Sequence, residues 1–276
     1  MSGPVEGLCT GRLPSATGGR LPATPPIGPP PALPGRRAVA CPAHTGGLRE
    51  MSEGASNLRG VTDIDWSDIR PRLAALAAHP RSGEVFGSGG HEWVLEPALT
   101  GPELADLEAQ FGVELPADYR AFLRQAGRGG AGPAYGLFPV LRKGDSWRWS
   151  GDGADLTETA RLAEPFPHTE AFNPAEGFPE PPDEEEGEDA EDAYWEEHTR
   201  MLAEVSTPGL LYLCHLGCAY REALVVSGPH RGVMWADDMA DDGGYRPVPD
   251  TDGQPQTFTR WYRTWLDQAE ATVSKP

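Results

Sequence analysis

Carboxylates are the residues of this chain most able to do chemistry, and one group of them is closely spaced. The segment 237–242 reads Asp-Asp-Met-Ala-Asp-Asp. Carboxylate oxygens bind Mg²⁺ or Ca²⁺, and paired carboxylates can act as general acid and base. The segment lacks the ligand order and the glycine of an EF-hand, and it lies where a strand would turn back, a position that aspartate favours. The sequence therefore favours a polar turn, with a metal-dependent hydrolase using Asp237, Asp238, Asp241 and His215 as the alternative.

Cys214, His215 and Cys218 form a second group with metal-ligand chemistry. A closed structural zinc site needs four ligands, and no second Cys or His pair appears at a usable spacing, so that His198 is the nearest candidate. Alternation along a strand would put Cys214 and His215 on opposite faces. Buried strand cysteines explain the pattern better, and we predict no metal and no cofactor.

Motifs of common enzyme families are missing from the sequence. The glycine-rich stretch 127–132 follows a predicted helix and precedes a strand, which is the reverse of a P-loop or dinucleotide site, and it has no Lys-Ser/Thr pair. Neither a GxSxG elbow nor an HExxH helix occurs. We therefore predict that the protein is not an enzyme.

The densest charge run lies between residues 180 and 197. Like charges at this density extend a chain, which favours a solvated loop inserted between core elements. The alternative is a docking site for a basic partner, because a concentrated negative field raises the rate of association. The carboxylates of such a site would be Asp183, Glu184, Glu185, Glu186, Glu188, Asp189, Glu191 and Asp192.

Charge and aromatic residues also bear on the partner. The formal net charge of −19 in 276 residues repels nucleic-acid backbones, so we expect a basic protein as partner and no nucleic acid. Trp147 and Trp149 are two residues apart and share one face of a predicted strand. They would form either an exposed aromatic contact for the partner or a buried contact with a flanking helix.

Two capped amphipathic helices dominate the segment 100–127. Thr100 and Glu103 form a capping box, Gly112 suits a left-handed helix end, Pro116 suits a first helical position, and Gly127 closes the second helix. Apolar residues follow helical spacing in both helices. Both faces need a cover, which predicts packing against a sheet or further helices.

The remaining elements alternate between helical and extended patterns. We expect helices over 64–78, 156–163, 194–205 and 258–269, a hairpin pairing 85–86 with 93–95, and strands over 137–141, 147–149, 210–216, 223–226 and 233–235. Short connections between the last strands favour antiparallel neighbours. The predicted fold class is α+β, a single domain with a mostly antiparallel sheet flanked by helices.

This arrangement resembles the SUKH superfamily, the Smi/Knr-like proteins that include a cell-wall-assembly regulator and many bacterial immunity proteins against toxins. The residues that carry the resemblance are Leu107, Phe111, Gly112, Leu115, Pro116, Tyr119, Phe122, Leu123, Gly127, Phe138, Pro139, Gly232, Trp235, Trp261 and Trp265. The resemblance implies a non-enzymatic binding protein, either an immunity protein that occludes the cleft of a toxin, with a basic nuclease as the natural candidate, or a regulatory adaptor. The acidic insertion departs from the compact family pattern.

Composition divides the chain into three predicted parts. Residues 1–57 form a Pro/Gly-rich leader that cannot offset its ordering entropy by burial, and either translation starts at Met51 or the leader is a disordered tail. Residues 58–270 form the SUKH-like domain with the acidic insertion 180–197, and 271–276 form a tail. No apolar run approaches the roughly 20 residues that span a bilayer, and four scattered cysteines suit a reducing compartment, so we expect a cytoplasmic protein.

Overall fold

The computed structural model describes residues 64–183 and 187–275. The predicted leader, including Met51, and the carboxylates Glu184, Glu185 and Glu186 lie outside these residues. In the described part, the chain forms an α+β fold in which every strand pair is antiparallel. The predicted fold class is confirmed.

The chain order alternates helices with short strands. The helices are α1 (Ile69–Ala77), α2 (Ser88–His91), α3 (Gly101–Phe111), α4 (Ala117–Gln125), α5 (Glu188–Glu204) and α6 (Phe258–Val273). The strands are β1 (Val140–Lys143), β2 (Ser146–Trp149), β3 (Leu210–Gly217), β4 (Tyr220–Val225), β5 (Met234–Asp237) and β6 (Tyr245–Pro247).

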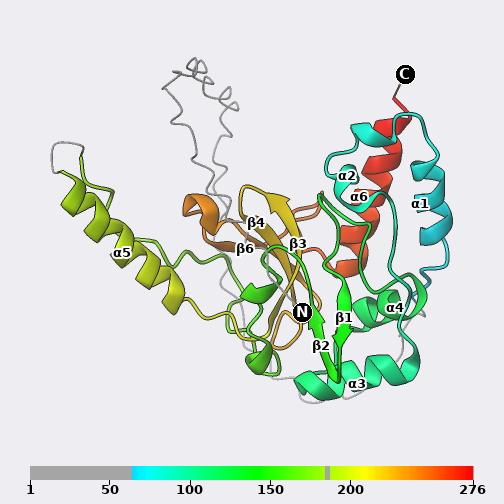
Figure 1. The fold of residues 1–276 in the computed structure, drawn as a ribbon, viewed down its shortest axis with the longest axis horizontal. Helices are drawn as coiled ribbons and strands as arrows, with labels where there is room; N and C mark the ends of the chain where they lie inside the picture. The colour runs from blue at the N-terminus through cyan, green and yellow to red at the C-terminus, as the bar shows by residue number, and fades with distance from the viewer. Residues whose placement is uncertain (1–63, 184–186, 276) are drawn as a thin grey trace, which may run out of the picture. The chain divides into compact units, whose positions relative to one another are not determined.

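Four strands make the central sheet, in the order β3-β4-β5-β6, while β1 and β2 form a separate hairpin (Figure 1). The sheet is a meander whose register aligns Leu211 with Leu224 and Ala223 with Trp235. The first five residues of β3 are all buried, so this strand is covered on both faces. The three strands predicted over 210–235 are therefore confirmed, each with slightly shifted ends.

Helices α3 and α4 form the predicted pair joined at Leu115-Pro116. Thr100 and Glu103 make a complete capping box, and Gly112 adopts the left-handed conformation with φ of 64°. Gly127 was expected to end the second helix, but the structure gives another reason for a glycine at this position. A Cβ atom there would lie 2.6 Å from the carbonyl oxygen of Glu96, so the position requires glycine for close backbone approach.

An aromatic cluster joins α4 and α6 to the residues that precede α1. The ring of Trp66 meets Phe122 edge-on at 5.2 Å and Tyr262 at 5.8 Å between centroids. Asp118 adds a polar link, since its Oδ2 accepts a hydrogen bond of 3.0 Å from the backbone N–H of Thr259 at the start of α6. Segments almost 200 residues apart in sequence thus form one core.

The hairpin predicted for 85–86 and 93–95 is wrong. The chain coils through a 3₁₀ turn (Ser82–Glu84) and α2, and the Ser88 hydroxyl donates to the carbonyl oxygen of Ser82. Gly87, Glu92 and Trp93 all have positive φ, which is incompatible with extended strands. The predicted helix over 156–163 is also wrong, because two short 3₁₀ turns, Ala154–Leu156 and Thr159–Arg161, occupy that region.

Candidate functional site

The acidic insertion folds into a helix earlier than its charge predicts. Helix α5 begins at Glu188, directly after Gly187, so the expected loop over 180–197 and the expected helix start at Tyr194 are both corrected. Glu188, Asp189 and Glu191 occupy the first turn. Negative side chains there interact favourably with the positive end of the helix dipole, each by about 0.3–1 kcal/mol. Their interaction with the helix dipole at the N-terminal end therefore offsets part of the repulsion between these carboxylates.

A single buried residue anchors α5, since His198 is the only buried side chain of its 17 residues. The imidazole packs against the rings of Phe178 at 5.1 Å, Trp195 at 5.6 Å and Tyr194 at 5.9 Å. Its Nε2 lies 3.2 Å from Oδ1 of Asp242, in the turn before β6. Tyr194 adds a contact with the ring of Phe178 at 5.5 Å, and most other side chains of the helix are exposed.

The segment that precedes α5 is attached to the edge of the central sheet. Phe172 and Tyr245 exchange backbone hydrogen bonds of 2.9 and 2.7 Å, which adds one residue pair beside β6. The ring of Phe172 is stacked between His168 at 3.5 Å and Tyr245 at 5.0 Å. The Asn173 side chain donates a hydrogen bond to the carbonyl oxygen of Asp242. One side of the candidate site is thus fixed to the sheet.

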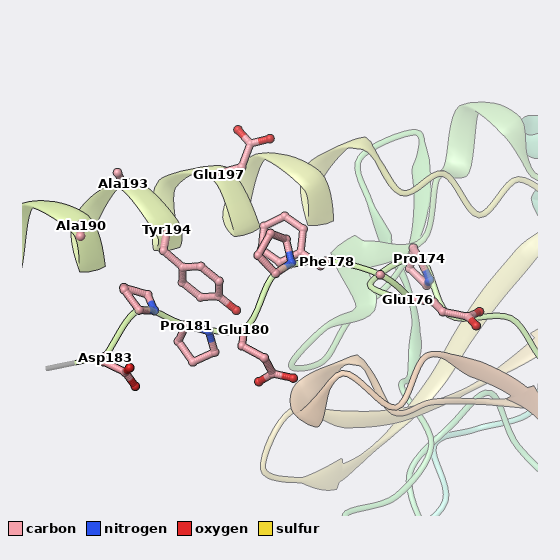
Figure 2. A pocket seen from close by; sticks show the side chains of 13 residues that line it. Pro174, Glu176, Phe178, Glu180, Pro181, Asp183, Ala190, Ala193, Tyr194 and Glu197 are labelled. Atoms are coloured by element: carbon pink, nitrogen blue, oxygen red, sulfur yellow. The ribbon is translucent and has the colours of Figure 1, made fainter. Parts of the chain in front are cut away.

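A groove of about 920 Å³ lies between this segment and α5 (Figure 2). Figure 2 shows Tyr194 projecting from α5 toward the segment, with its hydroxyl group on the side of Glu180. The residues that line the groove are Pro174, Glu176, Gly177, Phe178, Pro179, Glu180, Pro181, Pro182, Asp183, Ala190, Ala193, Tyr194 and Glu197. Its walls combine aromatic rings, prolines and carboxylates.

The groove is strongly negative. The sequence from Glu176 to Glu197 contains twelve carboxylates and no Lys or Arg. Among the described residues, no basic side chain forms an ion pair with Glu176, Glu180 or Asp183. Glu197 differs, because it pairs with Arg200 one turn along the helix. Partial burial and the nearby carboxylates of Asp242 and Glu180 raise the pKa of the Tyr194 hydroxyl.

The predicted partner-binding residues fall into three groups. Asp183 lines the groove, and Glu188, Asp189, Glu191 and Asp192 are exposed on α5 without lining it. Trp147 and Trp149 are buried, with 2% and 6% of their surface exposed, so the exposed aromatic contact is wrong. The Trp147 indole donates to Asp106, and the Trp149 indole donates to the Tyr119 hydroxyl, each at 3.0 Å. Both indoles serve the packing of the β1-β2 hairpin against the helices.

The carboxylates proposed for the hydrolase alternative bond to different side chains and do not form one site. Oδ2 of Asp237 accepts a hydrogen bond of 2.8 Å from the Tyr212 hydroxyl, and burial raises the pKa of Asp237. Asp238 pairs with Arg246 at 2.8 Å. In the part of the chain that the structure describes, no three His, Cys, Asp or Glu side chains converge as metal ligands. Nothing in this geometry favours a catalytic metal centre.

Sequence reasoning missed a half-buried carboxylate on the central sheet. Oε2 of Glu222 accepts a hydrogen bond of 2.8 Å from the Trp261 indole and lies 3.8 Å from the sulfur of Cys214. Burial raises the pKa of Glu222 and of the Cys214 thiol. No local signal indicates this position, because a Glu in a strand is ordinarily solvent-facing.

A second exposed surface also escaped sequence reasoning, since three separate loops form it. The Tyr135 ring lies 5.5 Å from Phe86 and 5.5 Å from His215, with which it stacks. Phe86, Val94 and Tyr135 are among the few large apolar side chains that are exposed, at 64%, 62% and 46%. The carboxylates beside it, Glu96 and Asp152, already pair with Arg128 and Arg221, so this surface does not indicate the charge of a partner.

A family model for the SMI1 / KNR4 family (SUKH-1) matches residues 98–248. The chain belongs to the SMI1/KNR4 (SUKH-1) family. The matched region runs from just before α3 to the end of β6, so it contains α5 and the groove of this SUKH-1 protein. Comparisons with curated proteins and with solved structures find no significant match. No helix in the described ranges has the length and apolar character to cross a membrane.

Proposed function

We propose that this SUKH-1 protein is a non-enzymatic binding domain that neutralises a toxin by covering its active cleft. The acidic groove beside α5 is the observation that supports this proposal, because it offers a partner both shape and negative charge. The family includes immunity proteins of this kind. A basic nuclease toxin is the partner we favour, since a cleft that binds phosphates carries the opposite charge.

Binding would begin with electrostatic steering. A field from a dozen carboxylates attracts a basic surface over a distance set by the salt concentration, about 10 Å at 0.1 M. Steering of this type raises association rates by about 10- to 1,000-fold at low salt. The exposed sides of α5 would then meet the rim of the cleft, and the aromatic groove would hold a projecting segment of the toxin.

Inhibition of a toxin tests the proposal directly. The proposal predicts a toxin domain in the reading frame next to this gene; that domain would be purified and its nuclease activity measured with increasing amounts of the full chain. We expect stoichiometric inhibition. No inhibition by an excess of folded chain would contradict the proposal, and binding without inhibition would indicate a regulatory adaptor instead.

Charge variants test whether α5 guides the docking. Replacing Asp189, Glu191 and Asp192 by their amides should slow association by about tenfold at 50 mM NaCl and reduce its salt dependence. A matched variant removes the same charge elsewhere, through Glu92→Gln, Asp145→Asn and Asp155→Asn. Equal association rates for the two variants would show that only net charge matters.

A further inference from the structure

The groove beside α5 holds features that select one kind of cationic side chain. Tyr194 presents a partly exposed ring, and Figure 2 shows the carboxylates of Glu180 and Asp183 on one side of the segment, with Pro181 between them. Neither carboxylate has a basic partner among the described residues. An entering cation would therefore meet carboxylates that are not already ion-paired within the described residues.

The wall of the groove also limits how a partner can bind. Pro179, Pro181 and Pro182 have no backbone N–H, so this wall cannot pair with an added β-strand. Recognition must then use side chains, as it does in grooves that bind extended peptides on aromatic rings. The volume of about 920 Å³ accommodates an extended segment together with a long side chain.

We propose that this groove binds an extended peptide segment through an arginine, whose guanidinium group stacks on Tyr194 and pairs with Glu180, while Asp183 adds to the negative charge of the groove. The inference rests on the proposed function and names the residue type of the partner that enters the groove. A guanidinium group is planar, stacks on aromatic faces and offers several N–H donors to carboxylates. The ammonium group of lysine is compact and strongly hydrated, so it gains less from the same surroundings.

Three synthetic peptides test this selectivity. They share the sequence Ac-GXSGXSGXG-NH₂, where X is arginine, lysine or citrulline, and they are titrated into the full chain by calorimetry in 150 mM NaCl. The indole N–H signal of Trp195 gives a local readout by NMR, because this exposed ring lies 5.0 Å from Tyr194. The signal is assigned by its loss in Trp195→Phe.

We expect the arginine peptide to bind about two- to fivefold more tightly than the lysine peptide, the ratio that an exposed cation–π contact provides. The neutral citrulline peptide should not bind measurably. Glu180→Gln with Asp183→Asn should weaken both cationic peptides, while the matched pair Glu92→Gln with Asp145→Asn, exposed and outside the groove, should keep the preference for arginine.

Tyr194 variants decide the outcome. Tyr194→Leu should make the arginine and lysine peptides equal, and Tyr194→Trp should keep the preference even if the leucine variant loosens α5. Equal affinity of the unchanged chain for both peptides would overturn the proposal, as would a preference that survives in Tyr194→Leu. Toxin inhibition without an arginine preference would refute only this inference, whereas an arginine preference without toxin inhibition would refute only the proposed function.

Discussion

Removal of the His198 side chain should detach α5 without unfolding the sheet. His198 contacts three aromatic rings and Asp242, and it is the only buried residue of the helix. Ring contacts contribute about 0.5–1.5 kcal/mol each beyond burial, and the hydrogen-bond contact with Asp242 contributes about 0.5–1.5 kcal/mol. Since the contacts are not additive, we take about 2 kcal/mol for His198→Ala, a roughly 30-fold change in the local opening equilibrium.

Hydrogen exchange measures this effect where it occurs. Helices in proteins owe most of their stability to tertiary packing, so the amides of α5 should exchange about 30-fold faster in His198→Ala. The amides of β3 and α6 should keep their protection, because their core does not include α5. Thr199→Ala, at the exposed neighbouring position, serves as the control and should change neither region.

Two results would refute this reasoning. If α5 keeps its protection in His198→Ala, contacts other than those of His198 hold the helix. If the amides of the central sheet lose protection equally, α5 is part of the global folding unit. In either case the groove could not be treated as a separately anchored element.

Three further variants test the core, and a fourth, at Gly112, serves as a comparison. Burial raises the pKa of Glu222, so the folded state holds this proton more tightly than the unfolded chain does. The wild type therefore loses stability as the pH rises above about 4.3, the pKa of an unperturbed Glu. In urea unfolding, the free energy of unfolding of Glu222→Gln should increase relative to that of the wild type between pH 4 and pH 7. Trp149→Phe should cost about 1–3 kcal/mol, since it removes the buried hydrogen bond to Tyr119, and should leave partner affinity unchanged. Gly127→Ala should cost about 2–3 kcal/mol by overpacking, measured by thermal unfolding. Gly112→Ala should cost only about 1 kcal/mol, because its positive φ is unfavourable but the space around it is open.

Each of these variants has a result that would count against its explanation. If the difference in free energy of unfolding between Glu222→Gln and the wild type is constant with pH, the pKa of this carboxyl is not raised in the folded state. Lower partner affinity in Trp149→Phe, with stability restored by low temperature, would return this indole to the binding surface. Equal costs at the two glycines would mean that the backbone near Glu96 yields to the added Cβ.

Local sequence signals predicted the elements whose packing they also determine. The capping box at Thr100, the proline at position 116 and the apolar stripe of α6 gave helices that the structure confirms, because caps and periodicity act within a few residues. The antiparallel strands followed from their short connections. These signals cover the region that fixes the fold class.

Other features depend on contacts between distant segments and could not be predicted. The pattern at 85–95 alternates like a hairpin, yet left-handed residues at Glu92 and Trp93 redirect the chain. Trp147 and Trp149 could lie on either side of their strand until the position of the helices was known. The groove exists only because Phe172 joins the sheet edge and His198 reaches Asp242, and neither contact has a local signature.

The link between Asp118 and Thr259 affects how this protein can be divided. The family match ends at residue 248, but α6 begins ten residues later and contributes Phe258 and Tyr262 to the same aromatic cluster as Trp66. A recombinant fragment cut at the limits of the match would lack both ends of that cluster and expose the apolar face of α4 to water. Fragments intended for crystallisation or partner screening should therefore extend at least from Ile64 to Val273.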